Sequence, residues 1–147
     1  MLQPLSNYLE QMIVLEASDI FVSTHLPVSA KVNGELTPLD DYVLSDDEAL
    51  TLVESAMTDK QINEFHNTKE CNFAIATEEG RFRISAFWQR DQAGMVIRRI
   101  VTTIPDVGDL GLPSVLTDVI MKKRGLVLFV GGTGTGKSTS LAALLGY

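Results

Sequence analysis

A glycine-rich stretch near the end of the chain carries the residue types that bind nucleotide phosphates. Gly131, Gly136, Lys137 and Ser138 occupy the fixed positions of the pattern Gly-x-x-x-x-Gly-Lys-Ser within GGTGTGKSTS. Glycines let backbone N–H groups approach phosphate oxygens without a Cβ in the way, and a helix that follows such a loop directs its positive end towards them. The pattern is that of a P-loop, and it predicts a site for a nucleoside triphosphate.

Each residue of this P-loop has an expected role. We expect the Lys137 ammonium to reach the β- and γ-phosphates as the catalytic lysine, and the Ser138 hydroxyl to bind Mg²⁺. Thr139 is placed to contact the α-phosphate region. The remaining nucleotide-binding candidates are the loop residues Gly131, Gly132, Thr133, Gly134, Thr135 and Gly136.

The segments around the P-loop are those that would hold it in place. The apolar run GLVLFV, residues 125–130, predicts a buried strand that leads into the loop, and a helix is expected after it. Upstream, Ser114 is expected to cap a short helix that runs to Lys123, with Gly125 beyond it as the C-cap. Residues 104–113 have Pro, Gly and Asp at loop density and predict a linker.

The first hundred residues contain helix and hairpin signals in alternation. Residues 4–17 predict an amphipathic helix, and residues 18–24 predict a strand. The pair Asn33-Gly34 predicts a hairpin turn, because both residues tolerate positive φ. Capping boxes that begin at Ser45 and Thr58 predict two further helices, to Met57 and towards His66.

Three more strands follow, joined at Glu79-Gly80 and after a break at residues 91–94, and we interpret them as an antiparallel meander. With the earlier segments they predict a compact α+β domain that ends near Val101. Alternation along GRFRISAFW places Phe82, Ile84, Ala86 and Trp88 on one face of a strand, and Arg81, Arg83 and Ser85 on the other.

Composition excludes several classes of function. The net charge of −7 disfavours general binding to nucleic acid or to anionic membranes, which requires a surplus of Lys and Arg. The longest apolar run is much shorter than the roughly 20 residues of a membrane span. Cys71 is the only cysteine, so no intrachain disulfide can form. We therefore expect a cytoplasmic protein.

Other residues with chemical potential have plainer interpretations. His25 and His66 lack partners at metal-ligand spacing, and nothing in the sequence indicates a lowered pKa for Cys71. We expect Trp88 and Cys71 to lie in the core. A second acidic strand end and a residue that orients the attacking water do not follow the P-loop, so we expect the chain to be a fragment of a longer ATPase.

The chain as a whole resembles the type IV pilus retraction ATPases, the PilT/PilU family. The residues that carry the resemblance are ASDIFVSTHLPVSAKVNGEL, GRFRISAFWQRDQAGMVIRRI, the linker and GGTGTGKSTSLAAL. ECNFAI, SAFWQR and GMVIRRI are most similar to the PilU branch of that family.

The resemblance implies a domain organisation and a set of partners. It implies a PAS-like amino-terminal domain over residues 1–103, a linker over 104–113, and the truncated start of a RecA-like α/β ATPase domain over 114–147. The full-length protein would be a homo-hexamer that uses ATP and Mg²⁺ to retract pili and drive twitching motility. It would act with a PilT-type paralogue and a pilus platform at the cytoplasmic face of the inner membrane, without nucleic acid and without a membrane span.

Two arginines acquire a candidate role through the resemblance. In related secretion ATPases, arginines of the amino-terminal domain contact the nucleotide phosphates, and the matching positions here are Arg83 and Arg98. Strand alternation puts Arg83 on a polar face, and a guanidinium suits phosphate geometry. The alternative, that both are ordinary solvated or ion-paired surface arginines, remains open.

Three other functions compete with pilus retraction. A type II secretion or pilus-extension ATPase shares the P-loop and the arginine pair. The chain by itself can also be a non-catalytic oligomerisation or interaction domain. A nucleic-acid helicase would need a basic channel, which the acidic balance disfavours.

Overall fold

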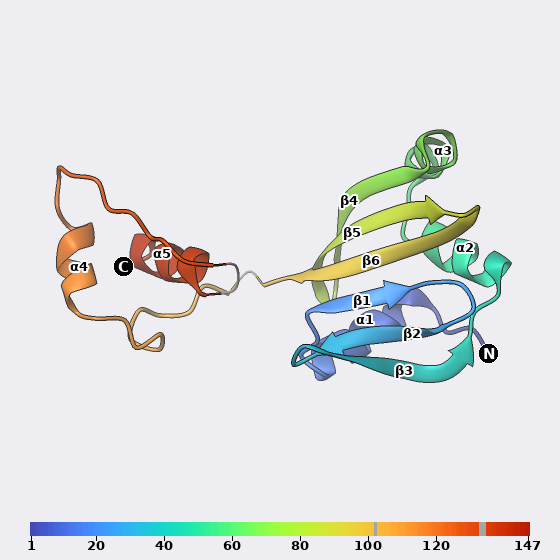
Figure 1. Ribbon diagram of the computed structural model, residues 1–147, viewed down its shortest axis with the longest axis horizontal. Helices are drawn as coiled ribbons and strands as arrows, with labels where there is room; N and C mark the ends of the chain where they lie inside the picture. The colour runs from blue at the N-terminus through green and yellow to red at the C-terminus, as the bar shows by residue number, and fades with distance from the viewer. Residues whose placement is uncertain (102, 133–134) are drawn as a thin grey trace. The chain divides into compact units, whose positions relative to one another are not determined.

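The computed structural model describes residues 1–101, 103–132 and 135–147. It divides into two compact units, Met1–Ile100 and Val101–Tyr147. The amino-terminal unit consists of a six-stranded antiparallel sheet and three helices (Figure 1), so the α+β fold predicted from the sequence is confirmed.

The sheet joins segments that are far apart in the sequence. Its strands lie in the spatial order β3-β2-β1-β6-β5-β4, and each neighbouring pair is antiparallel. At its centre β1 pairs with β6 (Figure 1), so that Asp19 and Arg98, 79 positions apart, are Cα partners. This central pair unites the first hairpin with the later meander. The strand bounds are β1 (Asp19–Val22), β2 (Pro27–Val32), β3 (Glu35–Val43), β4 (Glu70–Thr77), β5 (Gly80–Gln89) and β6 (Gln92–Ile100).

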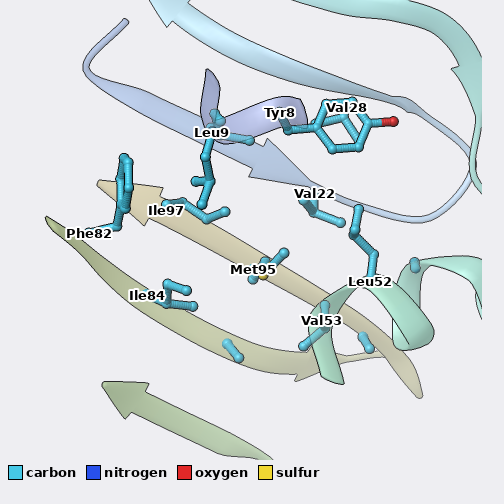
Figure 2. Close-up of a cluster of buried hydrophobic side chains, with 14 of the residues drawn as sticks. Tyr8, Leu9, Val22, Val28, Leu52, Val53, Phe82, Ile84, Met95 and Ile97 are labelled. Carbon is cyan, nitrogen blue, oxygen red and sulfur yellow. The ribbon is translucent and has the colours of Figure 1, made fainter. Parts of the chain in front are cut away.

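One face of the sheet forms the core with helices α1 (Leu5–Val14), α2 (Asp46–Glu54) and α3 (Asp59–Thr68). Successive side chains of a strand alternate between faces, and the core members follow that period. The cross-strand partners Ile20, Ile84 and Ile97 are fully buried among helix residues such as Leu9 and Val53, as Figure 2 shows in part. Each such side chain contributes about 1.5–3 kcal/mol by leaving water. The opposite face carries the charged side chains of the central strands, Asp19, Lys31, Arg83 and Arg98, and is called the polar face below.

Two of the hairpins turn on residues with positive φ. Asn33 (φ 49°) and Gly34 (φ 84°) connect β2 to β3, so the predicted turn is confirmed. The break predicted at residues 91–94 is wrong, because β6 already begins at Gln92. Arg90 (φ 53°) and Asp91 (φ 60°) alone make the turn. Both turns have the two positive φ values whose twist matches that of the strands, although Arg is a rare choice for one.

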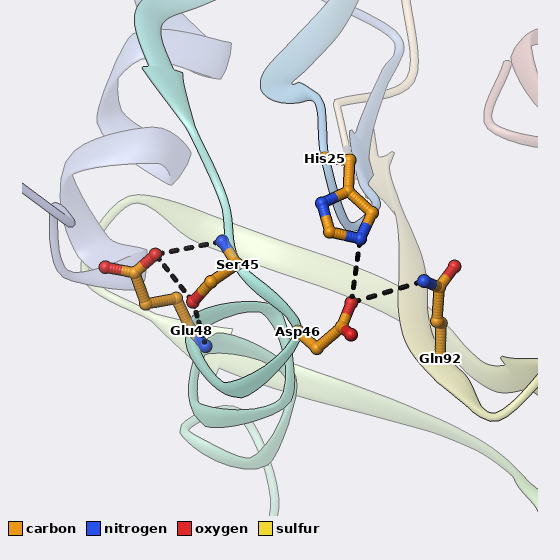
Figure 3. Close-up of polar contacts among 5 residues, drawn as sticks. All are labelled: His25, Ser45, Asp46, Glu48 and Gln92. Atoms are coloured by element: carbon orange, nitrogen blue, oxygen red, sulfur yellow. Dashed lines mark hydrogen bonds and ion pairs between the residues drawn. The ribbon is translucent and has the colours of Figure 1, made fainter.

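Both predicted capping boxes are present. Ser45 accepts a hydrogen bond from the Glu48 N–H at the start of α2, and Thr58 accepts one from the Gln61 N–H at the start of α3. Figure 3 shows the reciprocal bonds of Ser45 and Glu48. The Tyr42 hydroxyl also donates to Glu48, and this bond, with those from Ser45, lowers the pKa of the Glu48 carboxyl. The two helices thus satisfy their own first-turn donors.

The carboxy-terminal unit contains the short helix α4 (Val115–Ile120) and the helix α5 (Lys137–Leu145). Ser114 does not cap α4 through its side chain, contrary to the prediction; its backbone is already helical, and its carbonyl accepts from Thr117. Helix α4 ends at Ile120 with Met121 as its C-cap, so Gly125 is not the cap that was predicted.

The strand predicted at residues 125–130 is not formed. Leu126, Leu128 and Val130 are 83%, 73% and 90% exposed, and the segment has no regular secondary structure. A strand exists only through hydrogen bonds to a neighbour, and the described part of residues 101–147 contains no second strand. The apolar run at residues 125–130 predicted a buried strand, but the described residues of this unit do not bury it.

Among the residues described, no helix has both the length and the apolar character needed to cross a bilayer.

Candidate nucleotide-binding site

The P-loop lies directly before α5, as its sequence predicted. Gly131, Gly132, Thr135 and Gly136 precede the helix, and Lys137 is its first residue. Two of the predicted nucleotide-binding residues, Thr133 and Gly134, lie outside the described residues.

Two glycines of the loop are required by its geometry. A Cβ added to Gly131 would lie 2.8 Å from the Thr135 Oγ1, closer than real side chains come. Gly136 has φ 86°, a left-handed conformation that costs a residue with a Cβ. The Thr135 side chain thus packs against the Gly131 backbone, and a left-handed glycine leads into the first turn of α5.

The Lys137 side chain folds back over this loop. Its Nζ donates to the Gly132 carbonyl, which also accepts from the Thr135 Oγ1 at 2.7 Å. Lys137 is half-buried, while the neighbouring Ser138 and Thr139 are exposed. The ammonium is therefore held beside the loop, next to the first turn of α5.

The start of α5 differs from the starts of α2 and α3. No side chain among the described residues caps it, and its first turn contains no acidic residue. The first N–H groups of a helix have no partner within it, and the helix dipole makes this end positive. Lys137 adds a further positive charge there. An anion such as a phosphate group would satisfy the free donors and offset both charges.

An open groove of about 570 Å³ runs beside this helix start in the carboxy-terminal unit. Its walls include Ser138 and Thr139 of the P-loop helix, and Thr103 and Ile104 of the preceding segment. The volume is within the range of small-molecule sites, which extends from about 300 to 1,000 Å³. The two hydroxyl groups assigned to Mg²⁺ and the α-phosphate region therefore border open space.

The two candidate arginines of the amino-terminal unit lie side by side on the polar face of the sheet. Arg83 of β5 and Arg98 of β6 are Cα partners, and both are exposed. Like charges directly opposite each other destabilise a sheet, so an anion between them would be favourable. The Arg98 Nε donates to the Asp19 Oδ1 at 2.9 Å. Among the described residues, no ion pair involves Arg83.

Sequence reasoning overlooked Asp19. This carboxylate lies on the polar face of β1, directly opposite Arg98, and its side chain is only 10% exposed. The signal in the sequence was an acidic residue at the start of a strand, which has no evident meaning until the register of β1 against β6 is known.

The histidines pair with carboxylates. His25 lies 3.3 Å from the Asp46 Oδ1, which also accepts from Gln92 at 3.3 Å (Figure 3). His66 lies 2.6 Å from Glu54. No group of three or more potential metal ligands occurs in the described part of the chain.

The two residues expected in the core have buried surroundings. Trp88 packs on Phe65 with their ring centroids 5.6 Å apart, and the Lys69 Nζ lies 4.5 Å from the Trp88 ring. Cys71 is 3% exposed, and burial raises the pKa of its thiol. Trp88 is thus half-buried against the core with Lys69 over its ring, and the Cys71 thiol is enclosed within the core.

Comparison with known proteins gives matches along the whole chain. A family model described as type II/IV secretion system protein matches residues 1–147. The type IV pilus ATPase PilU of Pseudomonas aeruginosa is 48% identical over 140 residues, which are 95% of this chain and 37% of that protein. The type IV pilus retractation ATPase PilT of the same organism is 37% identical over 132 residues, 89% of this chain and 38% of that protein. The chain thus spans less than two-fifths of the length of these relatives.

Solved structures match the backbone as well. A crystal structure of the pilus retraction motor PilT with bound ADP superposes with a TM-score of 0.86 at 29% identity, over 99% of this chain and 43% of that one. The ATPase DotB of Legionella pneumophila superposes with a TM-score of 0.80 at 26% identity, over 95% of this chain and 41% of that one.

Proposed function

This chain belongs to the type II/IV secretion system protein family, and from that premise we propose that it is the amino-terminal portion of an ATPase that retracts type IV pili. The names of the relatives PilU and PilT support the pilus as the substrate, since both are called type IV pilus ATPases. The solved PilT motor contains ADP, which supports an adenine nucleotide as the ligand.

The observation that carries the proposal is the helix start at Lys137. A helix that begins with a lysine, without an acidic residue or a side-chain cap among those described, is stabilised by an anion at its end. A glycine at position 131 leaves room for the Thr135 hydroxyl, and the left-handed Gly136 stands directly before the helix, so both glycines fit a phosphate-binding loop. The phosphates of a nucleoside triphosphate would supply this anion, so the start of α5 suits a nucleotide as its ligand.

The residues of this loop have distinct roles in the proposed reaction. The Lys137 ammonium stabilises the negative charge that develops on the γ-phosphoryl oxygens as the bond to the β-phosphate breaks. The Ser138 hydroxyl would hold Mg²⁺, which would supply positive charge to offset that of the phosphates. Thr139 orients the α-phosphate region. These roles need no acid–base residue in the loop itself, because positioning and electrostatics dominate phosphoryl transfer.

Arg83 and Arg98 complete the proposed phosphate site in the assembled motor. Their guanidinium groups share one face of the sheet, and each offers planar N–H donors that match phosphate oxygens. We propose that they contact the nucleotide phosphates when the motor closes.

The proposed motor is a homo-hexamer at the cytoplasmic face of the inner membrane. Its partners are a PilT-type paralogue and the pilus platform, and it couples each round of ATP hydrolysis to the removal of pilin subunits from the pilus base. Residues 104–113 are the hinge that transmits closure between the PAS-like and ATPase domains in this proposal.

Deletion of the gene that encodes this chain is expected to abolish or strongly reduce twitching, because extended pili then lack one of the two motors proposed to act together in withdrawing them. The measurement is the twitching zone of the deletion strain and the number of surface pili. A plasmid copy of the full-length gene should restore both.

The same strain discriminates the competing functions. Loss of surface pili with the gene deleted would contradict retraction and indicate an extension ATPase. Normal twitching together with a defect in protein secretion would also contradict retraction, and would indicate a type II secretion ATPase.

A further inference from the structure

The carboxylate of Asp19 is the most enclosed charged group on the polar face of the amino-terminal sheet. Its side chain is 10% exposed, although it lies on the face that the helices leave uncovered. Its Oδ1 accepts from the Arg98 Nε at 2.9 Å, and its Oδ2 accepts from the Ser18 Oγ at 2.9 Å. Both oxygens are therefore engaged, and the group is fixed on its strand.

The strand register gives Asp19 two basic neighbours, of which it pairs with one. Across the sheet, Lys31, Asp19, Arg98 and Arg83 are successive Cα partners on β2, β1, β6 and β5. The ion pair within 4.0 Å is the one to Arg98. An enclosed carboxylate without a partner is costly, so the pair is favoured before any ligand arrives.

The pair is asymmetric, because Asp19 is enclosed while the Arg98 side chain is 70% exposed. Asp19 engages the Nε, the donor nearest the arginine stem. The terminal nitrogens of a guanidinium carry four of its five N–H donors. Those of Arg98 remain at the exposed end of the side chain. Arg83, which has no ion pair among the described residues, has no comparable restraint.

We propose that Asp19 is a positioning residue that holds Arg98 by its Nε, so that the terminal N–H groups of Arg98 are presented to the phosphates of the nucleotide. This inference rests on the proposed function, in which Arg98 contacts those phosphates. Holding a long side chain in its binding orientation removes part of the entropy that binding would otherwise cost. Arg98 is the pre-arranged member of the pair, and Arg83 is ordered when the nucleotide binds.

The variant Asp19→Asn distinguishes two roles for Asp19, one through its negative charge and one through positioning Arg98, because the two roles predict opposite effects. Asparagine has nearly the shape of aspartate but no charge, so the face becomes more positive. If Asp19 acted only through its charge, the variant would bind the nucleotide phosphates more tightly and hydrolyse ATP at least as fast. If Asp19 positions Arg98, hydrolysis slows despite the added positive charge.

The first test uses nuclear magnetic resonance of the 147-residue chain, without nucleotide. The Nε–H of Arg98 should exchange with solvent more slowly than that of Arg83. Asp19→Asn, which keeps an acceptor oxygen but loses the charge, should weaken this protection, and Asp19→Ser, which is too short to reach, should remove it. Lys31→Gln, which changes the other basic neighbour of Asp19, should leave the protection intact. An Arg98 Nε–H that exchanges as fast as that of Arg83 in the unaltered chain would overturn the proposal.

The second test measures ATP hydrolysis by a full-length protein that contains these residues. Arg98→Ala should lower kcat by about 100-fold, and Asp19→Asn by about tenfold, less than a 1 Å misplacement can cost. In the Arg98→Ala background, Asp19→Asn should have no further effect, since there is no arginine left to position. A purely structural role of Asp19 would instead add its effect to that of Arg98→Ala.

The outcomes separate this inference from the function on which it rests. A large loss in Arg98→Ala with none in Asp19→Asn would overturn the role of Asp19 and leave the phosphate contact intact. Unchanged hydrolysis in Arg98→Ala would instead overturn the phosphate contact itself. Asp19→Ser is a second variant without the charge. If Asp19→Asn fails to fold, the hydrolysis rate of Asp19→Ser decides the question by the same criteria.

Discussion

Replacement of Lys137 by alanine in a full-length protein that contains this chain is expected to lower kcat for ATP hydrolysis by about 10³-fold. The lysine is the cation that the loop holds at the start of α5, where its Nζ donates to the Gly132 carbonyl. Without it, the charge that develops on the γ-phosphoryl oxygens lacks its nearest compensating cation. The measurement is steady-state release of phosphate at saturating ATP and Mg²⁺.

Lys122→Ala is the matched control for this variant. Lys122 is an exposed lysine of the same unit that follows α4, outside the P-loop. It should hydrolyse ATP at the unaltered rate, so a general effect of one lost positive charge is excluded. Circular dichroism should show the same helix content for both variants. Turnover in Lys137→Ala equal to that of the control would contradict the role assigned to this lysine.

Ile97→Ala is expected to destabilise the amino-terminal unit by about 2–5 kcal/mol. Ile97 is fully buried in β6, and it is the Cα partner of two other buried isoleucines, Ile20 and Ile84 (Figure 2 labels Ile84 and Ile97). The truncation leaves a cavity where the two halves of the sheet join. Since whole domains are stable by only about 5–15 kcal/mol, one such change is a large fraction of the total.

Chemical denaturation of the 147-residue chain measures this loss, with fluorescence as the signal. Trp88 is the only tryptophan and packs against the core of the amino-terminal unit, so it reports on that unit. Ile100→Ala is the control on the same strand, because Ile100 is 36% exposed. It should cost less than about 1 kcal/mol. Equal losses for the two variants would show that the core described here does not stabilise the unit.

The features that could be predicted from the sequence are those with local causes. The turn at Asn33-Gly34 and the helix starts at Ser45 and Thr58 depend on residues within a few positions of one another, and all three are confirmed. The turn at Arg90-Asp91 was misplaced, because neither residue is a glycine and its position depends on the pairing of Gln89 with Gln92.

Features that depend on residues far apart in the chain could not be predicted from the sequence. The central pairing of β1 with β6, and with it the ion pair of Asp19 and Arg98, requires a register between segments 79 positions apart. The run at residues 125–130 is apolar enough for a buried strand, but strand formation depends on neighbouring strands that the described residues of its unit do not supply.

The candidate site divides in the same way. The position of the glycine-rich loop directly before a helix could be predicted, because the P-loop pattern places particular residue types at fixed spacing within one short segment. The face shared by Arg83 and Arg98 became evident only from the pairing of β5 with β6. The enclosure of Asp19 is a property of the folded sheet, since it depends on the side chains of the neighbouring strands as well as its own.

The measurement that tests the central claim most directly is a crystal structure of the full-length protein with Mg²⁺ and a non-hydrolysable ATP analogue. We expect the backbone N–H groups of the loop and of Lys137 to lie within hydrogen-bond distance of the β- and γ-phosphate oxygens, and the Lys137 Nζ to have left the Gly132 carbonyl for those oxygens. Triphosphate density elsewhere, with the Lys137 Nζ still on Gly132 and the start of α5 in contact with solvent alone, would contradict the proposal that this chain provides the nucleotide site of a pilus motor.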